Sequence, residues 1–351
     1  MLARWSLLVA AGLVGCASLI GIDEATVADS GASSSSGSSD ASFGPEAQSS
    51  GAASSSSSSS GVSSSGELED AGNPVGDLAY AAWPMPQPSP AADDYAATAE
   101  VVFDEVTKLT WQRVVPAAPM HRADAEAYCN GLSLDGRDDW RLPSRMELVS
   151  LLDVAGTTSP RIQQAAFPDT PSDSFWSQSR AWAMATMIPQ SWAVHFGSGH
   201  VSAQSQDESE PPHRVRCVRG MDQISPVPQH WEVHEGTVRD RSTGLLWLRA
   251  PQQGFGTLAD AAFYCQSRSQ DGESGFRLPT LRELLSLIAE REPAGSGGLD
   301  GYAFPAGGPH PAWTVSPAVG STDVMTVDVS LGGTTGEDDP ASENAAVRCV
   351  K

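Results

Sequence analysis

The chain has 351 residues and a formal net charge of -22, from 43 acidic and 21 basic side chains. This acidic balance repels phosphate backbones, so we expect no nucleic-acid partner. It also argues against adsorption to anionic lipids or sulfated polymers, unless a local arginine patch overrides it.

The N-terminus has the pattern of a lipoprotein export signal. Arg4 precedes an apolar run that ends in Leu13-Val14-Gly15-Cys16 and is too short to span a bilayer. We therefore predict a signal peptide at residues 1–15 and lipidation of Cys16. The alternative is an ordinary signal peptide in which the cysteine falls here by chance. Ala17 follows the cysteine in place of the aspartate that signals inner-membrane retention. We thus expect an outer-membrane lipoprotein on the cell surface of a Gram-negative bacterium, held to the membrane by its lipid alone.

Residues 16–96 are predicted to form a tether between the lipidated N-terminus and the folded part. From about residue 30 to 65 the chain is mostly serine, glycine and alanine. Such a segment buries too little apolar surface to offset the entropy of ordering it, so we expect disorder. Residues 74–96 contain five prolines and are predicted to stiffen the tether into a stalk.

The remainder contains two copies of one unit, predicted as domains at residues 97–220 and 230–351. Residues 106–153 align with 242–289 at a constant offset of 136, with roughly 40% of positions identical. Past small gaps, Val215-Arg216-Cys217-Val218 aligns with Val347-Arg348-Cys349-Val350. A unit of this length is an ordinary domain, so the chain is predicted to hold two tandem domains.

Each copy is predicted to be α+β, with two helices packed on an antiparallel sheet. In copy one, residues 101–107 and 109–114 alternate like a hairpin, and residues 122–131 have helical apolar spacing. A second helix is indicated by a capping box at residues 144–147, and residues 280–283 repeat it. Strands are predicted at residues 175–178, 192–196, 200–203 and 214–219.

Two arginines lie beside these capping boxes. Arg141 and Arg277 each precede the box, and its glutamates are Glu147 and Glu283. A buried arginine that pairs with an acid and fixes the helix start is our main interpretation. A ligand-binding arginine is the alternative.

Four cysteines follow Cys16, none with the C-x-x-C spacing of a metal site. Because each repeat holds two equivalent cysteines, we predict the disulfides Cys129–Cys217 and Cys265–Cys349, which suit an oxidising compartment. Free thiols are the alternative.

The landmarks of copy one resemble one bacterial family, and those of copy two resemble it more loosely. They are Leu109-Thr110-Trp111-Gln112, Tyr128-Cys129, Asp139-Trp140-Arg141-Leu142-Pro143, Glu147-Leu148, Phe167-Pro168, Phe175-Trp176-Ser177 and residues 215–220. The family is named for the C-terminal domain of the Legionella collagen-like adhesin and is similar to the C-type lectin-like fold. The resemblance implies ligand binding at a cell surface, with a sulfated polysaccharide bound by a basic surface in the named member. Both copies of this chain are acidic instead.

The candidate ligand-binding residues all lie in copy one. Trp182 lies in a loop-like stretch without a partner in copy two, and Arg214, Arg216 and Arg219 alternate along the last predicted strand. The tryptophans Trp111, Trp176, Trp192, Trp247 and Trp313 are interpreted as core, with a sugar-stacking platform as the alternative.

Metal binding and catalysis are poorly supported. His195 and His200 flank a glycine-containing turn, but copy two has Asp328 in place of His195, which argues against zinc. Calcium at Glu337, Asp338, Asp339 and Glu343 lacks EF-hand spacing, so we predict no cofactor. No nucleophile motif occurs, and no cysteine is left over for chemistry. We expect a non-catalytic surface lipoprotein that binds a glycan or a protein, with adhesion as its expected role. A structural envelope protein packed against its neighbours is the alternative.

Overall fold

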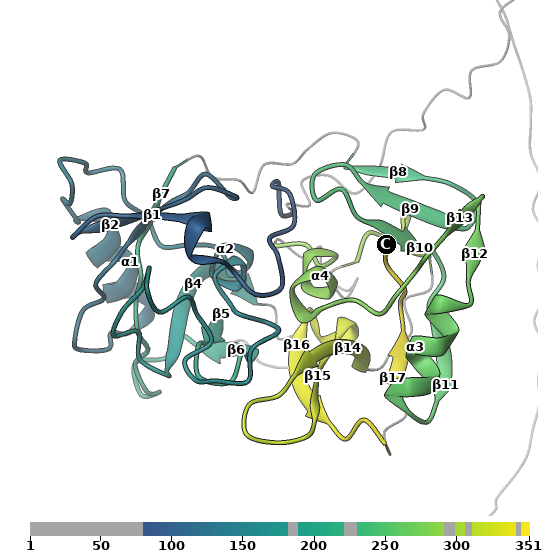
Figure 1. The fold of residues 1–351 in the computed structure, drawn as a ribbon. Coiled ribbons are helices and arrows are strands. Elements are labelled where there is room, and N and C mark those ends of the chain that lie inside the picture. Colours follow the sequence, from purple (N-terminus) through teal and green to yellow (C-terminus); the bar gives the residue numbers. More distant parts are fainter. Residues whose placement is uncertain (1–79, 182–188, 221–229, 291–298, 306–310, 342–344) are drawn as a thin grey trace, which may run out of the picture. The chain divides into compact units, whose positions relative to one another are not determined.

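The computed structural model describes residues 80–181, 189–220, 230–290, 299–305, 311–341 and 345–351 (Figure 1). All of these belong to one compact unit that spans Leu68–Lys351. The predictions for the signal peptide, for Cys16 and for Trp182 lie outside the described residues. No helix of the described part is long and apolar enough to cross a membrane.

Residues 80–96, which were predicted as part of the tether, belong to the folded body instead. Trp83 is 3% exposed and lies in the main hydrophobic cluster, and Tyr80 stacks on His230. The Val154 amide donates to the carbonyl of Pro88 at 2.9 Å. The prediction of a stalk over residues 74–96 is therefore wrong for residues 80–96. Burial of the aromatic side chains in this segment stabilises the folded arrangement more than the prolines favour an extended chain.

The first copy combines two small sheets with two α-helices. Its elements are η1 (Ala92–Asp94), β1 (Tyr95–Ala97), β2 (Val101–Asp104), β3 (Thr110–Gln112), α1 (Arg122–Asn130), α2 (Arg145–Ser150), β4 (Ser174–Ala181), β5 (Gln190–His195), β6 (Val201–Ser205) and β7 (Val218–Arg219). The strand orders are β1-β2-β3-β7 and β4-β5-β6, and all these neighbours run antiparallel. The predicted hairpin, both helices and the three middle strands are confirmed within a few residues.

The second copy follows a similar order of elements. They are β8 (Trp231–Val233), β9 (Thr237–Asp240), β10 (Leu246–Leu248), β11 (Gln252–Phe255), α3 (Leu258–Gln266), β12 (Ser269–Gln270), β13 (Glu273–Ser274), α4 (Leu281–Ser286), β14 (Pro311–Pro317), β15 (Val324–Asp328), η2 (Val329–Leu331), β16 (Thr334–Asp338) and β17 (Ala345–Val347). Its sheets have the orders β10-β9-β8, β11-β17-β14-β15-β16 and β12-β13. Most neighbours are antiparallel, whereas β14 and β17 pair in parallel.

The two capping boxes form as the sequence predicts. In copy one Ser144 Oγ accepts from the Glu147 amide at 3.1 Å, and the Glu147 carboxylate accepts from the Ser144 amide at 2.7 Å. The same carboxylate binds the Arg141 guanidinium through two bonds of 2.7 and 2.6 Å. Two amides at the helix start are thereby satisfied, and the arginine holds the carboxylate in place.

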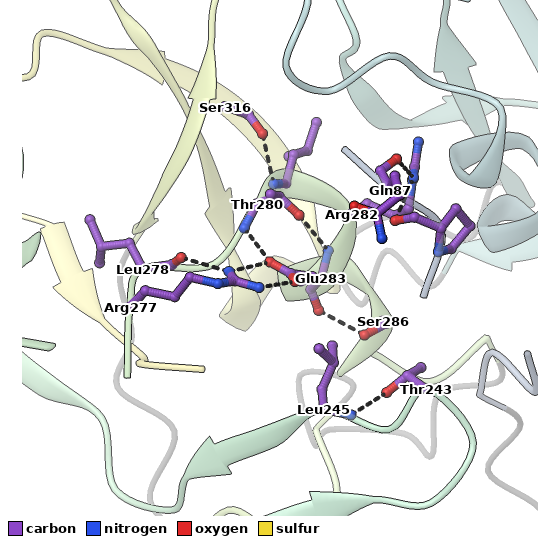
Figure 2. A network of polar contacts seen from close by, with 12 residues as sticks. Gln87, Thr243, Leu245, Arg277, Leu278, Thr280, Arg282, Glu283, Ser286 and Ser316 are labelled. Carbon is purple, nitrogen blue, oxygen red and sulfur yellow. Dashed lines mark hydrogen bonds and ion pairs between the residues drawn. The ribbon is translucent and has the colours of Figure 1, made fainter. Parts of the chain in front are cut away.

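Figure 2 shows the equivalent network of copy two. Arg277 donates to both carboxylate oxygens of Glu283, at 2.9 and 2.6 Å, and Glu283 also accepts from the Thr280 amide. The Leu281 amide donates to Ser316 Oγ of β14, which ties the helix start to the sheet. The predicted pairing of Arg141 and Arg277 with an acid is present in both copies. The expected burial is wrong for Arg277, whose side chain is 48% exposed, because it reaches Glu283 from the surface.

The disulfides and the tryptophans hold the interior of each copy. Cys129 is bonded to Cys217 and Cys265 to Cys349, which confirms both predicted pairs. Each bond links the first helix of its copy to the segment near its C-terminal end. The five tryptophans interpreted as core are all at most 4% exposed: Trp111, Trp176, Trp192, Trp247 and Trp313. The alternative of an exposed stacking platform is thus wrong for these five.

One hydrophobic cluster contains side chains from both copies. Leu148 and Leu152 of copy one and Leu284 and Ile288 of copy two belong to it, and all four are fully buried. Two smaller clusters surround the disulfides, one in each copy. The two family units are therefore separate in sequence but share their largest core.

Two buried arginines connect the short helices of the two copies. Arg282 donates from Nε to the Val149 carbonyl at 3.2 Å and from Nη2 to the Leu152 carbonyl, both at the end of α2. Arg145 donates to the Ile288 carbonyl at 3.0 Å, just after α4. Each arginine thus donates to carbonyls at or just after the end of the other helix, where a positive charge is also favoured by the helix dipole.

Candidate ligand-binding sites

The three candidate arginines of copy one do not form a common patch. Arg216 is 0% exposed and donates to the carbonyls of Gln112 and Arg113 at 2.7 and 2.9 Å. Its guanidinium also lies 4.8 Å from the centre of the Phe167 ring. Burial lowers the pKa of Arg216 to about 9, so the side chain is still charged at neutral pH.

The equivalent residue of copy two has the same environment. Arg348 is 4% exposed, donates to the Arg249 carbonyl at 3.0 Å and lies 4.9 Å from the centre of the Phe304 ring. A structural role is therefore common to both copies. The expectation that Arg216 contributes to an exposed ligand-binding patch is wrong, because residues 215–217 lie outside a strand and buried carbonyls hold the Arg216 guanidinium in the interior.

Arg219 lies at the surface in a two-bond ion pair. Its Nε and Nη2 donate to the two carboxylate oxygens of Asp139 at 2.8 and 3.1 Å. The hydrogen bonds to Asp139 raise the pKa of Arg219 and lower that of Asp139. The carboxylate of Asp139 offsets the charge of Arg219 and holds its side chain, and its role in binding stays a prediction.

Arg214 lies in a polar pocket of 240 Å³ on copy one. The pocket walls come from four separate parts of the sequence, and the lining residues are Pro119, Asp173, Ser174, His195, Pro212, His213 and Arg214. Backbone bonds place Arg214 there: its amide donates to the Ser174 carbonyl at 2.8 Å, and its carbonyl accepts from the Trp176 amide at 3.0 Å. The pocket is thus anchored directly on β4.

An acid, a guanidinium and imidazoles meet in this pocket. Arg214 Nε donates to Asp173 Oδ2 at 2.8 Å, and Nη1 donates to the Ala117 carbonyl. Within the described part of the chain, Nη2 of Arg214 makes no hydrogen bond. The His213 ring lies 4.4 Å from the Trp176 ring, and desolvation by burial lowers the pKa of His213. His213 is therefore mostly neutral at pH 7, and the pocket presents both donors and acceptors without strong net charge.

His195 connects this pocket to a chain of hydrogen bonds. Ser198 Oγ lies 3.1 Å from His195 Nδ1 and 2.8 Å from His200 Nδ1. Desolvation by burial also lowers the pKa of His200. The two imidazoles thus share a serine hydroxyl, and among the residues that the structure describes no group of three or more metal-ligating side chains is found. Glu343 of the weighed calcium site lies outside the described residues.

Copy two has no equivalent of the arginine in this pocket. His213 and Arg214 align with Ala345 and Ala346, which lie buried in β17. The parallel bridge between Phe175 and Arg214 corresponds to the parallel pairing of Ala312 with Ala346. The backbone arrangement is therefore shared, and the side chains that build the pocket belong to copy one alone.

The sequence indicated Arg214 as a ligand-binding candidate and His195 only as a weighed metal ligand, and it did not indicate the other residues of this pocket. Asp173, His195 and His213 have no pattern in common, and they meet only when β4, β5 and the segment around Arg214 come together. His213 directly precedes the candidate Arg214, and this position could have indicated that His213 lies in the same pocket. Asp173 could not be predicted as a neighbour of Arg214, because the sequence alone does not show which backbone segments pair.

These features define a class of protein: tandem α+β domains, each held by one internal disulfide, with a shared backbone plan and different surface pockets. The family comparison gives this class its name. The model of the Lcl C-terminal domain family matches residues 100–219 and 236–351, and the chain belongs to that family. No curated protein matches the chain.

Proposed function

We propose that this chain is a non-catalytic, lipid-anchored cell-surface protein whose Lcl C-terminal domains bind an extracellular glycan or protein. The observation that carries the proposal is the copy-one pocket, where Asp173, His213 and Arg214 converge beside β4. Convergent polar groups in a concave site are the ordinary form of a small ligand site.

The chemistry of the pocket suits a polar ligand of low charge. Asp173 offsets Arg214, and the lowered pKa of His213 keeps that imidazole neutral. Side chains that both donate and accept hydrogen bonds match the hydroxyl groups of a sugar or the polar side chains of a protein loop. This reasoning favours a neutral glycan or a protein surface over the sulfated polysaccharide that the family resemblance implies.

The position on the outer surface rests on the export pattern and on the family. The sequence around Cys16 predicts lipidation and an outer-membrane anchor, and an adhesin gives the family its name. A long serine-rich segment before residue 80 gives the domains reach from the membrane. We therefore place the binding domains outside the cell, and a role in adhesion follows from that place.

Binding of the full-length chain to arrays of glycans and of surface proteins tests the proposal. The chain is produced in an oxidising compartment and assayed with and without calcium at two salt concentrations. We expect saturable binding that Arg214→Ala weakens at least tenfold, and we expect Arg137→Ala, at an exposed arginine outside the pocket, to leave it unchanged. A folded chain with both disulfides that binds nothing would contradict the proposal and favour a structural envelope role.

A further inference from the structure

A second pocket lies on copy two, and residues of α3 and β12 contribute to its lining. Its volume is also 240 Å³, and its polar lining is formed by Glu235, Arg249, Tyr264, Arg268 and Gln270 over an apolar floor at Leu248. None of these residues belongs to the copy-one pocket. The comparison with copy one explains why the pocket exists.

In copy one a glutamine fills the equivalent position. Gln112 Nε2 donates to the Tyr128 hydroxyl at 2.8 Å, and its Oε1 accepts from the Cys217 amide at 3.2 Å. The offset of 136 aligns Gln112 with Leu248 and Tyr128 with Tyr264. Leucine cannot make either bond, and within the described part of the chain no residue hydrogen-bonds to the Tyr264 hydroxyl. The Tyr264 hydroxyl is therefore available to hydrogen-bond with a ligand in the pocket.

The rim of the pocket has changed from apolar to polar. Leu132 and Leu134 of copy one are partly buried and pack against the hydrophobic cluster around Cys129. Their counterparts at the same offset are Arg268 and Gln270. Leu248 adds apolar packing in place of the polar bridge, but the two polar rim residues cost apolar packing, so burial alone does not favour the rim changes.

A glycine gives Gln270 its place in the pocket. A Cβ on Gly236 would lie 2.1 Å from Gln270 Nε2. The Gln270 side chain therefore occupies the space that a side chain at position 236 would need. The aligned residue of copy one is Glu100, which accepts from the Asp135 amide at 3.1 Å. Copy two reverses this bond, because the Gly236 amide donates to Asp271 at 3.0 Å.

The charges in the pocket indicate what it binds. The Arg268 guanidinium stacks over the Tyr264 ring at 5.1 Å and is exposed, so its donors are held in one plane. Arg249 is already engaged by the carbonyls of Ala303 and Tyr302 at 3.2 and 2.9 Å. Glu235 adds one negative charge, so the lining is net positive by one, which suits a monoanion better than a dianion.

We propose that this pocket binds a small monocarboxylate that also carries hydroxyl or ammonium groups. The carboxylate lies on the guanidinium of Arg268, and Glu235 accepts hydrogen bonds from the ligand's hydroxyl or ammonium groups. Gln270 and the Tyr264 hydroxyl serve as further partners. An acidic monosaccharide and a free amino acid share this chemistry. The inference rests on the proposed binding function but uses a different pocket in the other copy.

Isothermal titration calorimetry of the full-length chain in detergent tests the inference. The probes are D-glucuronate and L-glutamine as carboxylates, with glucose as the neutral control and sulfate as the dianion control. We expect one or both carboxylates to bind, with glucose and sulfate at least tenfold weaker. Which carboxylate binds more tightly identifies the source of the ligand as a saccharide or an amino acid.

Two variants that restore the copy-one residues locate the site. Arg268→Leu removes the guanidinium, and Leu248→Gln rebuilds the glutamine–tyrosine bridge in the space of the ligand. We expect each to weaken carboxylate binding at least tenfold, whereas Arg137→Leu, the same loss of charge on copy one, leaves it unchanged. Arg268 is exposed, so its variant decides the outcome even where Leu248→Gln perturbs folding.

The inference is overturned when neither carboxylate binds, when sulfate or glucose binds equally well, or when Arg268→Leu binds like the unaltered chain. Array binding that depends on Arg214, measured on the same preparation, separates this failure from failure of the proposed function. Because the two pockets lie in different copies, Arg268→Leu is expected to leave the Arg214-dependent binding unchanged.

Discussion

Arg214 and Arg216 are two residues apart in the sequence, yet one lines a surface pocket and the other is fully buried. The sequence indicated the arginines but not their burial. A strand was predicted over residues 214–219, but the structure forms one only at Val218–Arg219. Arg216 is tolerated inside because carbonyls and an aromatic face surround its guanidinium. The repeat of that arginine as Arg348 was the signal for a structural role.

The ion pairs beside the capping boxes allow a matched stability prediction. The side chain of Arg141 is 19% exposed and that of Arg277 is 48% exposed, while their glutamate partners are buried. Glu147→Gln removes a charge-assisted pair in the drier site and is expected to lower the free energy of unfolding by about 2 kcal/mol. Glu283→Gln is expected to cost less, because water replaces part of the lost interaction. Urea titrations of both variants measure this order, and equal costs would contradict it.

The histidines of copy one predict the pH dependence of stability. Burial lowers the pKa of His213 and of His200 below the ordinary value of 6.5, against the opposing effects of Asp173 and Glu337. The unfolded chain therefore binds protons more readily, so stability is full above about pH 6.5 and falls as the pH drops below it. The melting temperature is expected to fall between pH 7.5 and 5.5, and less so in His213→Gln. An equal fall in melting temperature for the unaltered chain and for His213→Gln would show that His213 is not the cause.

At the scale of elements, helices were predicted better than strands. The capping boxes at residues 144–147 and 280–283 are local signals, and both helices begin where they predict. The strand predicted at residues 214–219 is reduced to β7 (Val218–Arg219), with single bridges at His213 and Arg214. Strand extent depends on distant partners, which a local pattern does not contain.

Arg282 is expected to link the elements of the two copies energetically. It donates to the carbonyls of Val149 and Leu152 in copy one and to those of Pro86 and Gln87 in the segment before it (Figure 2 shows the contact with Gln87). Arg282→Met removes the side-chain donor to the carbonyls of Leu152, Pro86 and Gln87 and is expected to cost on the order of 3 kcal/mol. Arg239→Met, at a partly exposed arginine, is the control and is expected to change stability little. Equal chemical-denaturation midpoints for the two variants would show that the linkage contributes nothing.

At the scale of the whole molecule, the sequence revealed the repeat but not the shared core. The prediction of two domains follows from the alignment, and the family model matches both copies. That Leu148 and Leu284 lie in one cluster, together with Trp83 from the supposed stalk, depends on tertiary packing. Prolines in residues 84–90 suggested extension, whereas the aromatic residues just before them bind the segment to the fold.

The shared core predicts that both copies unfold together. Calorimetry of the full-length chain is expected to show a single transition. Replacing Cys265 and Cys349 by alanine removes a crosslink over 84 residues and is expected to cost about 4 kcal/mol. That loss is expected to shift the single transition as a whole. Two transitions, with only one displaced by the copy-two change, would show that the copies are energetically independent.

Adhesion of intact cells to a surface coated with the ligand from the arrays tests the central claim most directly. Cells that display the unaltered chain are compared with cells that display equal amounts of Arg214→Ala, with surface amounts measured by antibody labelling. We expect the unaltered chain to retain cells and Arg214→Ala to reduce retention at least tenfold. Equal retention by both, or no labelling of the chain on intact cells, would contradict a surface protein that binds through the copy-one pocket.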